Sequence, residues 1–191
     1  MLKTIGKISL TALLFVGILA QPSLSEPESS SFQIARKPIK FSREKRRVQA
    51  KKGFSIIPPT GWKKSSLKKS KYILVYKAAP RNRFAVNLNV SANPDGGIVI
   101  KSVGPALKKQ FSKQFDKWKL GEDGHMTING HKAYYISSKF SMKGYRIQNL
   151  QFLLKNKKKK VFYIVTFTAL EKDYKAKRAA FMRAAKSIKL N

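Results

Sequence analysis

The segment from Phe84 to Ala92 carries the pattern that most restricts how this chain can fold. Its side chains alternate in character along the chain. The apolar set comprises Phe84, Val86, Leu88, Val90 and Ala92, and the polar set comprises Asn87, Asn89 and Ser91. Successive side chains of a β-strand point to opposite faces of the sheet. The pattern therefore predicts a half-buried strand of an antiparallel sheet, which ends in a turn at residues 93–97.

Six other segments have the composition or the alternation of β-strands. They are Phe54–Ile57, Tyr72–Lys77, Trp118–Met126, His131–Met142, Tyr145–Lys155 and Val161–Leu170. Turn residues separate the last four segments, and the Asn129–Gly130 dipeptide favours a tight hairpin. The alternation of the Tyr145–Lys155 segment slips near Asn149, which predicts a β-bulge there.

Two segments have helical spacing. Leu107, Phe111 and Phe115 recur every four residues, which predicts a helix with one apolar stripe. A second helix is predicted from about Lys172 to Ser187. Its apolar face would contain Tyr174, Phe181, Ala184, Ala185 and Ile188. The order of elements predicts an α+β fold, with a mainly antiparallel sheet of about six to seven strands and two helices packed on it.

The N-terminus has the three regions of a secretory signal peptide. Two lysines precede an apolar run from Ile8 to Ala20, which is shorter than the roughly 20 residues that a membrane-spanning helix needs. Small residues at Ser23 and Ser25 predict cleavage before Glu26, and an uncleaved anchor is the alternative. Export to the periplasm or the extracellular space is expected. Because the chain has no cysteine, we expect neither a lipoprotein nor a disulfide framework.

The chain is strongly basic. Its 41 Lys and Arg residues outnumber its 9 Asp and Glu residues, which gives a net charge of +32. Residues 26–191 keep 39 of these basic residues and all 9 acids, so their net charge is +30. A soluble domain typically carries a net charge of about 2–8 in magnitude. The excess of positive charge attracts anions. The alternative explanation of the high charge is that all exported proteins of the source organism are similarly basic.

Three parts are expected along the chain. Residues 1–25 would be the signal peptide, residues 26–52 a basic, flexible N-terminal arm, and residues 53–191 a single α+β domain. From Arg36 to Lys52 the arm has nine Lys or Arg residues and one acid, Glu44. Blocks of like charge are usually solvated and often serve as interaction arms.

Four short motifs follow one another in an order that matches a known family. They are Gly53–Ile56 with Pro58 and Gly61–Trp62, then Asn87–Val90, Asn129–Tyr134 and Val161–Thr166. Together they resemble the PsbP-like fold family, which includes bacterial DcrB-type envelope proteins. The resemblance covers Gly53 to Leu190 and implies an αβα sandwich. It also implies a non-catalytic binding or assembly role, and it identifies no ligand-binding residue.

The sequence offers few groups for catalysis. The predicted domain contains only six acids, namely Asp95, Asp116, Glu122, Asp123, Glu171 and Asp173. Asp95 is expected to make a local backbone hydrogen bond in its turn, and Glu171 and Asp173 to interact favourably with the dipole of the last helix. No phosphate loop, dinucleotide fingerprint or nucleophile motif is present. The sequence therefore predicts a protein that is not an enzyme and has no cofactor.

The densest polar group is the run from Glu122 to His125. A weak metal site is one interpretation of this run, but good metal sites need three or four converging ligands, so a solvated loop is the favoured interpretation. An uncharacterised hydrolase that uses Glu122, Asp123 and His125 is the remaining enzymatic alternative.

Three groups of basic residues are the predicted anion-binding residues. They are Arg43, Lys45, Arg46 and Arg47 in the arm, Lys63, Lys64, Lys68 and Lys69 in a loop, and Lys157, Lys158, Lys159 and Lys160 at a hairpin tip. Lysine binds phosphate as a point charge. The expected partners are anionic lipid headgroups, lipopolysaccharide or an acidic protein, and extracellular DNA or another polyanion is the alternative. For any single group, a solvated face is the competing interpretation.

Overall fold

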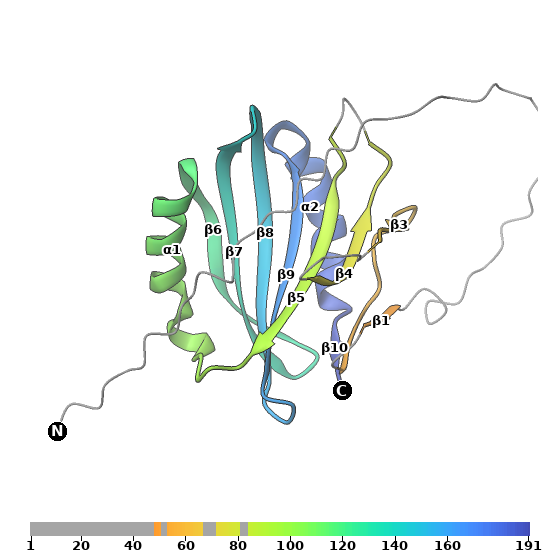
Figure 1. The fold of residues 1–191 in the computed structure, drawn as a ribbon, viewed down its shortest axis with the longest axis vertical. Helices are drawn as coiled ribbons and strands as arrows, with labels where there is room; N and C mark the ends of the chain where they lie inside the picture. Colours follow the sequence, from red (N-terminus) through yellow and green to blue (C-terminus); the bar gives the residue numbers. More distant parts are fainter. Residues whose placement is uncertain (1–47, 51–52, 67–71, 81–83) are drawn as a thin grey trace, which may run out of the picture.

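A seven-stranded antiparallel sheet forms the centre of the molecule (Figure 1). The computed structural model describes residues 48–50, 53–66, 72–80 and 84–191. The strands, in their order across the sheet, are β3 (Lys63–Lys64), β4 (Tyr72–Lys77), β5 (Asn87–Pro94), β9 (Val161–Leu170), β8 (Tyr145–Asn156), β7 (His131–Met142) and β6 (Asp116–Ile128). A smaller antiparallel sheet has the order β1 (Val48–Ala50), β2 (Phe54–Ile56) and β10 (Lys189–Leu190). Strand β1 belongs to the predicted arm, and the rest of that arm lies outside the described residues.

Two helices cover opposite faces of the large sheet (Figure 1). Helix α1 (Val103–Gln114) follows the short 3-10 helix η3 (Ile100–Ser102) and packs on β6 and β7. Helix α2 (Glu171–Lys186) packs on β8 and β9. Among the described residues, no helix combines the length and the apolar character needed to cross a membrane. The arrangement confirms the predicted α+β fold with two packed helices.

Each helix packs its predicted apolar stripe against the sheet, although Phe115 follows the end of α1 and is only half-buried. Leu107 and Phe111 of α1 are fully buried in one cluster, and Phe181 of α2 is fully buried in another. The rings of Phe181 and Phe167 stack with their centroids 5.0 Å apart. Strand β9 supplies both clusters, because Phe167 faces α2 while Ile164 faces α1. The centre of the sheet is therefore covered on both sides.

The polar face of the Phe84–Ala92 segment is buried, so the prediction of a half-buried strand is wrong. Strand β5 begins at Asn87, and Asn87 and Asn89 are each only 4% exposed. Their partners across the ladder are Thr168 and Thr166 of β9. The alternation reports two chemically different faces, but both of these faces lie inside the molecule.

Strand β8 has no bulge at Asn149, contrary to the sequence prediction. The ladder runs without interruption through Asn149, which lies opposite Ser138 on one side and Thr168 on the other. The Asn149 Oδ1 atom accepts a hydrogen bond of 3.1 Å from the backbone N–H of Ser138. Both faces of β8 are buried from Ile147 to Leu154. The polar residues that interrupt its alternation therefore lie within the interior and do not mark a break in pairing.

The hairpin turns determine which loops share an end of the sheet. Asn129 and Gly130 have φ values of 47° and 80°, as the tight hairpin predicted at this dipeptide requires. Because the strands are antiparallel, the β6–β7 turn and the β8–β9 turn lie at the same end, whereas the β7–β8 turn lies at the other. Strand β5 also ends here, since Pro94 pairs with Val161. We call this end, formed by residues 94–101, 129–132 and 155–160, the hairpin end; it is at the bottom of Figure 1.

Candidate anion-binding site

Of the predicted loop group Lys63, Lys64, Lys68 and Lys69, the described part of the chain contains only the first two lysines. Lys63 and Lys64 form the edge strand β3, where both side chains are exposed, so they are not in a loop as predicted. Lysine on an edge strand hinders pairing with another chain. The other predicted residues of this group and of the arm lie outside the described residues, and these are Lys68, Lys69, Arg43, Lys45, Arg46 and Arg47.

The lysines of β3 lie apart from the hairpin lysines. Lys63 pairs with Lys77, which the ladder connects to Asn87 and then to Thr168 near the far end of β9. The hairpin lysines immediately precede Val161, at the opposite end of the same strand. The structure therefore does not bring these two predicted groups together.

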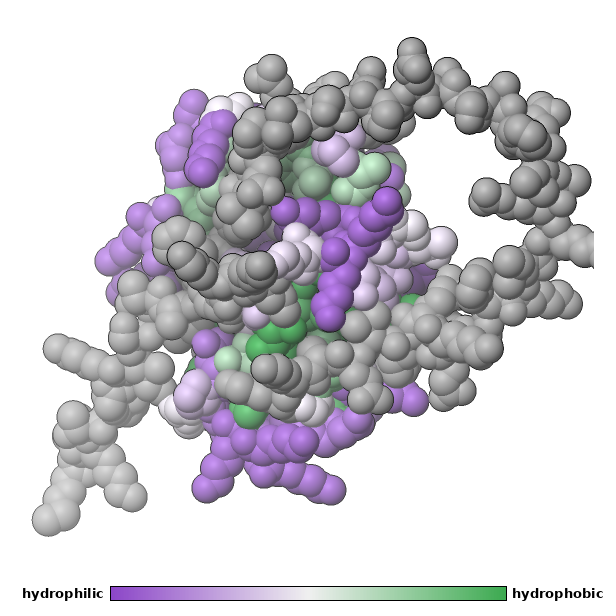
Figure 2. Space-filling model, turned by 45° about the vertical axis from the view of Figure 1, so that its right-hand side comes forward, coloured by the Kyte–Doolittle hydropathy of each residue, from purple (hydrophilic) through white to green (hydrophobic). Residues whose placement is uncertain are grey.

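The four hairpin lysines project from a well-held turn. Lys157, Lys158, Lys159 and Lys160 are all exposed. The Asn156 Oδ1 atom accepts a hydrogen bond of 3.1 Å from the backbone N–H of Lys159, and the backbone oxygen of Lys160 accepts one of 2.9 Å from Asp95. Figure 2 shows hydrophilic side chains extending from the lower end of the molecule, where Figure 1 places this hairpin.

Two further lysines, which the sequence analysis did not select, share the hairpin end. Lys101 lies in η3 and Lys132 follows the β6–β7 turn, and both are exposed. Together with Lys155, Lys157 and Lys158 they line a pocket of about 780 Å³. The sequence did contain a signal for this grouping. Alternate hairpins of an antiparallel sheet turn at the same end, so residues next to the Asn129–Gly130 turn must lie near the β8–β9 turn.

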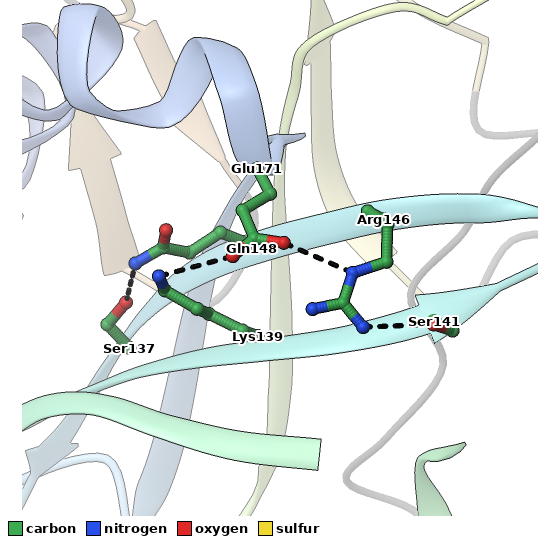
Figure 3. Close-up of polar contacts among 6 residues, drawn as sticks. All are labelled: Ser137, Lys139, Ser141, Arg146, Gln148 and Glu171. Carbon is green, nitrogen blue, oxygen red and sulfur yellow. Dashed lines mark hydrogen bonds and ion pairs between the residues drawn. The ribbon is translucent and has the colours of Figure 1, made fainter. Parts of the chain in front are cut away.

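Three of the six acids in the described part pair with basic residues away from the hairpin tip. The Glu122 carboxylate receives two hydrogen bonds of 2.7 Å from Arg178, and Asp123 lies 2.8 Å from Lys108. Glu171 lies between Lys139 and Arg146, 3.2 Å from each (Figure 3). Such pairs neutralise charge locally.

Asp95 is the one acid that forms an ion pair at the hairpin end within the described residues. Its Oδ2 atom lies 2.6 Å from Nζ of Lys155, and the same Nζ donates to the backbone oxygen of Ile98 at 3.2 Å. The expected local hydrogen bond of the Asp95 side chain is therefore replaced by an ion pair with another strand. The pair holds the loop after β5 against β8.

The Glu122–His125 run lies within strand β6, so the favoured prediction of a solvated loop is wrong. Neighbouring strand residues point to opposite faces, which directs Glu122 to Arg178 of α2 and Asp123 to Lys108 of α1. Hydrogen bonds from Lys108 and Tyr134 lower the pKa of the Asp123 carboxyl group. Across the described ranges, no three His, Cys, Asp or Glu residues lie close enough to hold a metal ion.

Apart from Lys155, the lysines of the hairpin end therefore carry charge that no ion pair within the described residues offsets. In the part of the chain that the structure describes, no ion pair involves Lys101, Lys132 or any of the four hairpin lysines. Exposed ammonium groups that surround a pocket attract phosphate or carboxylate groups. The chemistry available at this end is the binding of anions.

Comparisons with known proteins give similarities at the level of structure. No protein-family model matches the chain, and no curated protein matches it. The solution structure of the cyanobacterial PsbP protein from Synechocystis is similar with a TM-score of 0.58 and 16% identity, over 76% of this chain and 91% of that one. LpqN of Mycobacterium tuberculosis, which is involved in cell envelope biogenesis, has a TM-score of 0.52 and 11% identity, over 72% of this chain and 83% of that one. The Ran-binding protein Mog1p of Saccharomyces cerevisiae has a TM-score of 0.53 and 8% identity, over 72% of this chain and 90% of that one.

At these levels of identity the similarity shows the fold and nothing further. The match covers 91% of the PsbP chain, which is nearly its whole length. The chain has the PsbP-like fold that the four sequence motifs predict.

Proposed function

We propose that this protein is an exported, non-enzymatic binding protein that contacts anionic material of the cell envelope through the lysines of its hairpin end. The ligands would be lipid headgroups or lipopolysaccharide phosphates, and an acidic protein is the alternative. LpqN, which shares this fold, is involved in cell envelope biogenesis. The apolar run from Ile8 to Ala20, which has the form of a signal peptide, supports the same compartment.

The observation that carries the proposal is where the ion pairs lie: most of them lie away from the hairpin tip, and the exposed lysines at the hairpin end form none within the described residues. Four of the six acids of the described part are held in ion pairs, and the exceptions are Asp116 and Asp173. The partners of the four are Lys108, Lys155 and Arg178, and Lys139 together with Arg146. The exposed lysines at the hairpin end have no such partner among the described residues. Each lysine near an anionic membrane surface contributes about 1 kcal/mol to binding, so the lysines of one end suffice for a measurable affinity.

The same pairing argues against catalysis as the main role. A general acid or base must be free to exchange a proton with a substrate. Glu122 and Asp123 instead hold Arg178 and Lys108, and the ring of His125 packs against Tyr134 with the centroids 5.2 Å apart. We therefore assign no catalytic role to this run.

The proposal is tested by vesicle sedimentation across a salt series. The purified protein is mixed with vesicles of phosphatidylcholine alone or with vesicles that also contain phosphatidylglycerol. We expect binding to the anionic vesicles only, and we expect salt to weaken it because mobile ions screen exposed charges beyond about 10 Å at 0.1 M. Equal binding to both vesicles, or binding that salt does not change, would contradict the proposal.

Nucleic acid is the second candidate ligand, and the net charge of +32 is the observation that favours it. Competition separates it from the envelope ligands. Heparin and duplex DNA are added to the vesicle-bound protein at equal phosphate or sulfate concentration. Release by DNA at much lower concentrations than by heparin would favour nucleic-acid binding, whereas equal release by both is expected for a diffuse lysine surface.

A further inference from the structure

The pocket at the hairpin end has an apolar wall beneath its lysines. It is formed by the loop from Ile98 to Lys101, the start of β7, the β8–β9 hairpin and the last two residues of the chain. Its volume of about 780 Å³ lies within the range of about 300–1,000 Å³ that is usual for small-molecule sites. The pocket is therefore large enough for a ligand of moderate size.

The apolar wall contains the most exposed large apolar side chain in the described part. Val99 is 59% exposed, and Leu120 of β6, at 39%, is the next. Ile98, Ile100 and Leu190 also line the pocket. A single exposed apolar side chain is normal on a protein surface, but several apolar side chains that line one pocket among charged residues are typical of a ligand-binding groove.

The charged side chains that line the pocket are all lysines. Lys101, Lys132, Lys157 and Lys158 line the pocket, and His131 lies beside them. The lining side chains include no Asp or Glu. Lys155 is the lining lysine whose charge is neutralised, because it pairs with Asp95 at 2.6 Å. The remaining lysines are available for the head of an anionic ligand.

The ion pair also fixes the shape of the pocket. Lys155 Nζ contacts both the Asp95 carboxylate and the backbone oxygen of Ile98, so it anchors the loop that carries Val99. The backbone N–H of Ile98 donates to the oxygen of Asp95 at 3.0 Å, which closes the turn. A pocket held in this way does not have to be ordered by the ligand, which lowers the entropic cost of binding.

We propose that this pocket binds a single-chain anionic amphiphile, with the acyl chain along Val99, Ile98 and Leu190 and the anionic head among Lys101, Lys132, Lys157 and Lys158. Fatty acids and the anionic lysophospholipids both have this chemistry, which is one apolar chain and one anionic head. The inference rests on the proposed function and makes it more specific, since the ligand would be an individual lipid molecule and not only a membrane surface.

The test is isothermal titration of the purified protein below the micellar concentration of each probe. Dodecanoate and dodecyl phosphate are the two anionic probes, and they distinguish a carboxylate head from a phosphate head. Inorganic phosphate tests the head alone, and neutral dodecyl maltoside tests the chain alone. We expect at least one of the anionic probes to bind at least tenfold more tightly than either control probe. The proposal would be overturned if inorganic phosphate, or dodecyl maltoside, bound as tightly as both dodecanoate and dodecyl phosphate do.

Two variants with matched controls place the ligand in the pocket. Val99→Asn removes an apolar contact, and we expect about a tenfold loss of affinity for dodecyl phosphate or dodecanoate. Leu120→Asn alters the other exposed apolar side chain and should change nothing. Lys132→Gln should weaken binding about fivefold, and Lys109→Gln, on the exposed side of α1, should not. Wild-type affinity in Val99→Asn would overturn the proposal.

Vesicle binding by the same variants separates this inference from the proposed function. Val99→Asn keeps every lysine, so we expect it to bind anionic vesicles as the wild type does while it loses the single-chain probe. If wild-type protein binds anionic vesicles but no single-chain probe, the pocket proposal fails and the proposed function stands. If wild-type protein binds the anionic probes but no vesicle, the pocket proposal stands and the membrane-surface role fails.

Discussion

The ammonium nitrogen of Lys155 lies 2.6 Å from Oδ2 of Asp95, which joins strand β8 to the loop after β5. The two side chains are only 23% and 17% exposed, so solvent screens their attraction less than it does for a surface pair. The pair thus stabilises the loop at the hairpin end that carries Ile98 and Val99.

Replacing Asp95 with alanine should lower the free energy of unfolding by about 2 kcal/mol, because Lys155 then loses a charge-assisted hydrogen bond in a partly enclosed place. Urea denaturation measures the change. Asp116→Ala is the control, since Asp116 is exposed and forms no ion pair among the described residues, and it should change stability by at most about 0.5 kcal/mol. Equal effects of the two substitutions would show that the Lys155 pair does not stabilise the fold.

Gly53→Ala should destabilise the protein more than Gly61→Ala does. Both glycines have positive φ, of 76° and 81°, so alanine is strained by about 1–2 kcal/mol at either position. A Cβ at Gly53 would also overlap the backbone oxygen of Asn191 and lie 2.6 Å from Nζ of Lys159, whereas nothing lies within 4 Å of one at Gly61. We expect Gly53→Ala to lose at least about 1 kcal/mol more free energy of unfolding than Gly61→Ala does. Its melting temperature should therefore fall further. Identical losses would mean that the contact with Asn191 is not tight.

Asp123→Asn should reduce the dependence of stability on acid pH. Lys108 and Tyr134 lower the pKa of the Asp123 carboxyl group in the folded protein. A carboxyl whose pKa is lowered by folding stabilises the protein above its unfolded pKa of about 4, and this contribution is lost as the pH falls through the lower folded pKa. The wild type should therefore lose stability below about pH 4 more steeply than Asp123→Asn, which is already weakened at pH 7.

Urea midpoints between pH 2 and pH 7 measure this difference. Glu171, whose carboxyl pKa is lowered by Lys139 and Arg146, remains in the variant, so part of the acid dependence should persist. An Asp123→Asn protein with the full acid dependence of the wild type would contradict the role of the Lys108 and Tyr134 contacts.

Thr168→Val should stabilise the protein by about 1 kcal/mol. The Oγ1 atom of Thr168 is buried without a hydrogen-bond partner among the described residues, and such an atom costs free energy that a methyl group does not. Ser137→Ala is the contrasting change, because the Oγ atom of Ser137 accepts a hydrogen bond of 3.0 Å from Gln148 (Figure 3). Its loss should lower stability by about 1–2 kcal/mol. Calorimetry should give a melting temperature above that of the wild type for Thr168→Val and below it for Ser137→Ala. A Thr168→Val protein that melts below the wild type would contradict this assignment.

Local patterns in the sequence predict the long elements of the fold well. Strands β7 and β9 begin and end where their alternation and turn residues indicate. The predicted apolar side chains of both helices are buried except Phe115, which follows the end of α1 and is half-buried. The errors at Asn87 and Asn149 share one cause, which is that both strands are buried on both faces. In such a strand polar residues can lie in the interior, so neither the clean alternation of β5 nor the interrupted alternation of β8 indicates exposure or a break in pairing. Strand β10 has no local signal, because Lys189 and Leu190 become a strand only by pairing with β2.

The candidate site was predictable in part. A run of lysines in a turn is visible in the sequence, and the structure leaves Lys157 to Lys160 exposed as expected for anion binding. Lys101, Lys132 and Val99 are separate in the sequence and gain their significance only from their common end of the sheet. Hairpin topology accounts for Lys132, whereas the position of Val99 depends on the Lys155–Asp95 contact.

Charge neutralisation in two places tests most directly whether the hairpin end is the anion-binding surface. One variant replaces Lys157, Lys158, Lys159 and Lys160 with glutamine, and the other replaces Lys109, Lys113, Lys172 and Lys175, which are exposed on the two helices. Both lose the same charge, and both are compared with the wild type in sedimentation with phosphatidylglycerol-containing vesicles across a salt series. Binding should fall, with a shallower salt dependence, in the hairpin variant and remain near the wild type in the helix variant. Equal losses in the two variants would show that total charge, and not the hairpin end, determines binding.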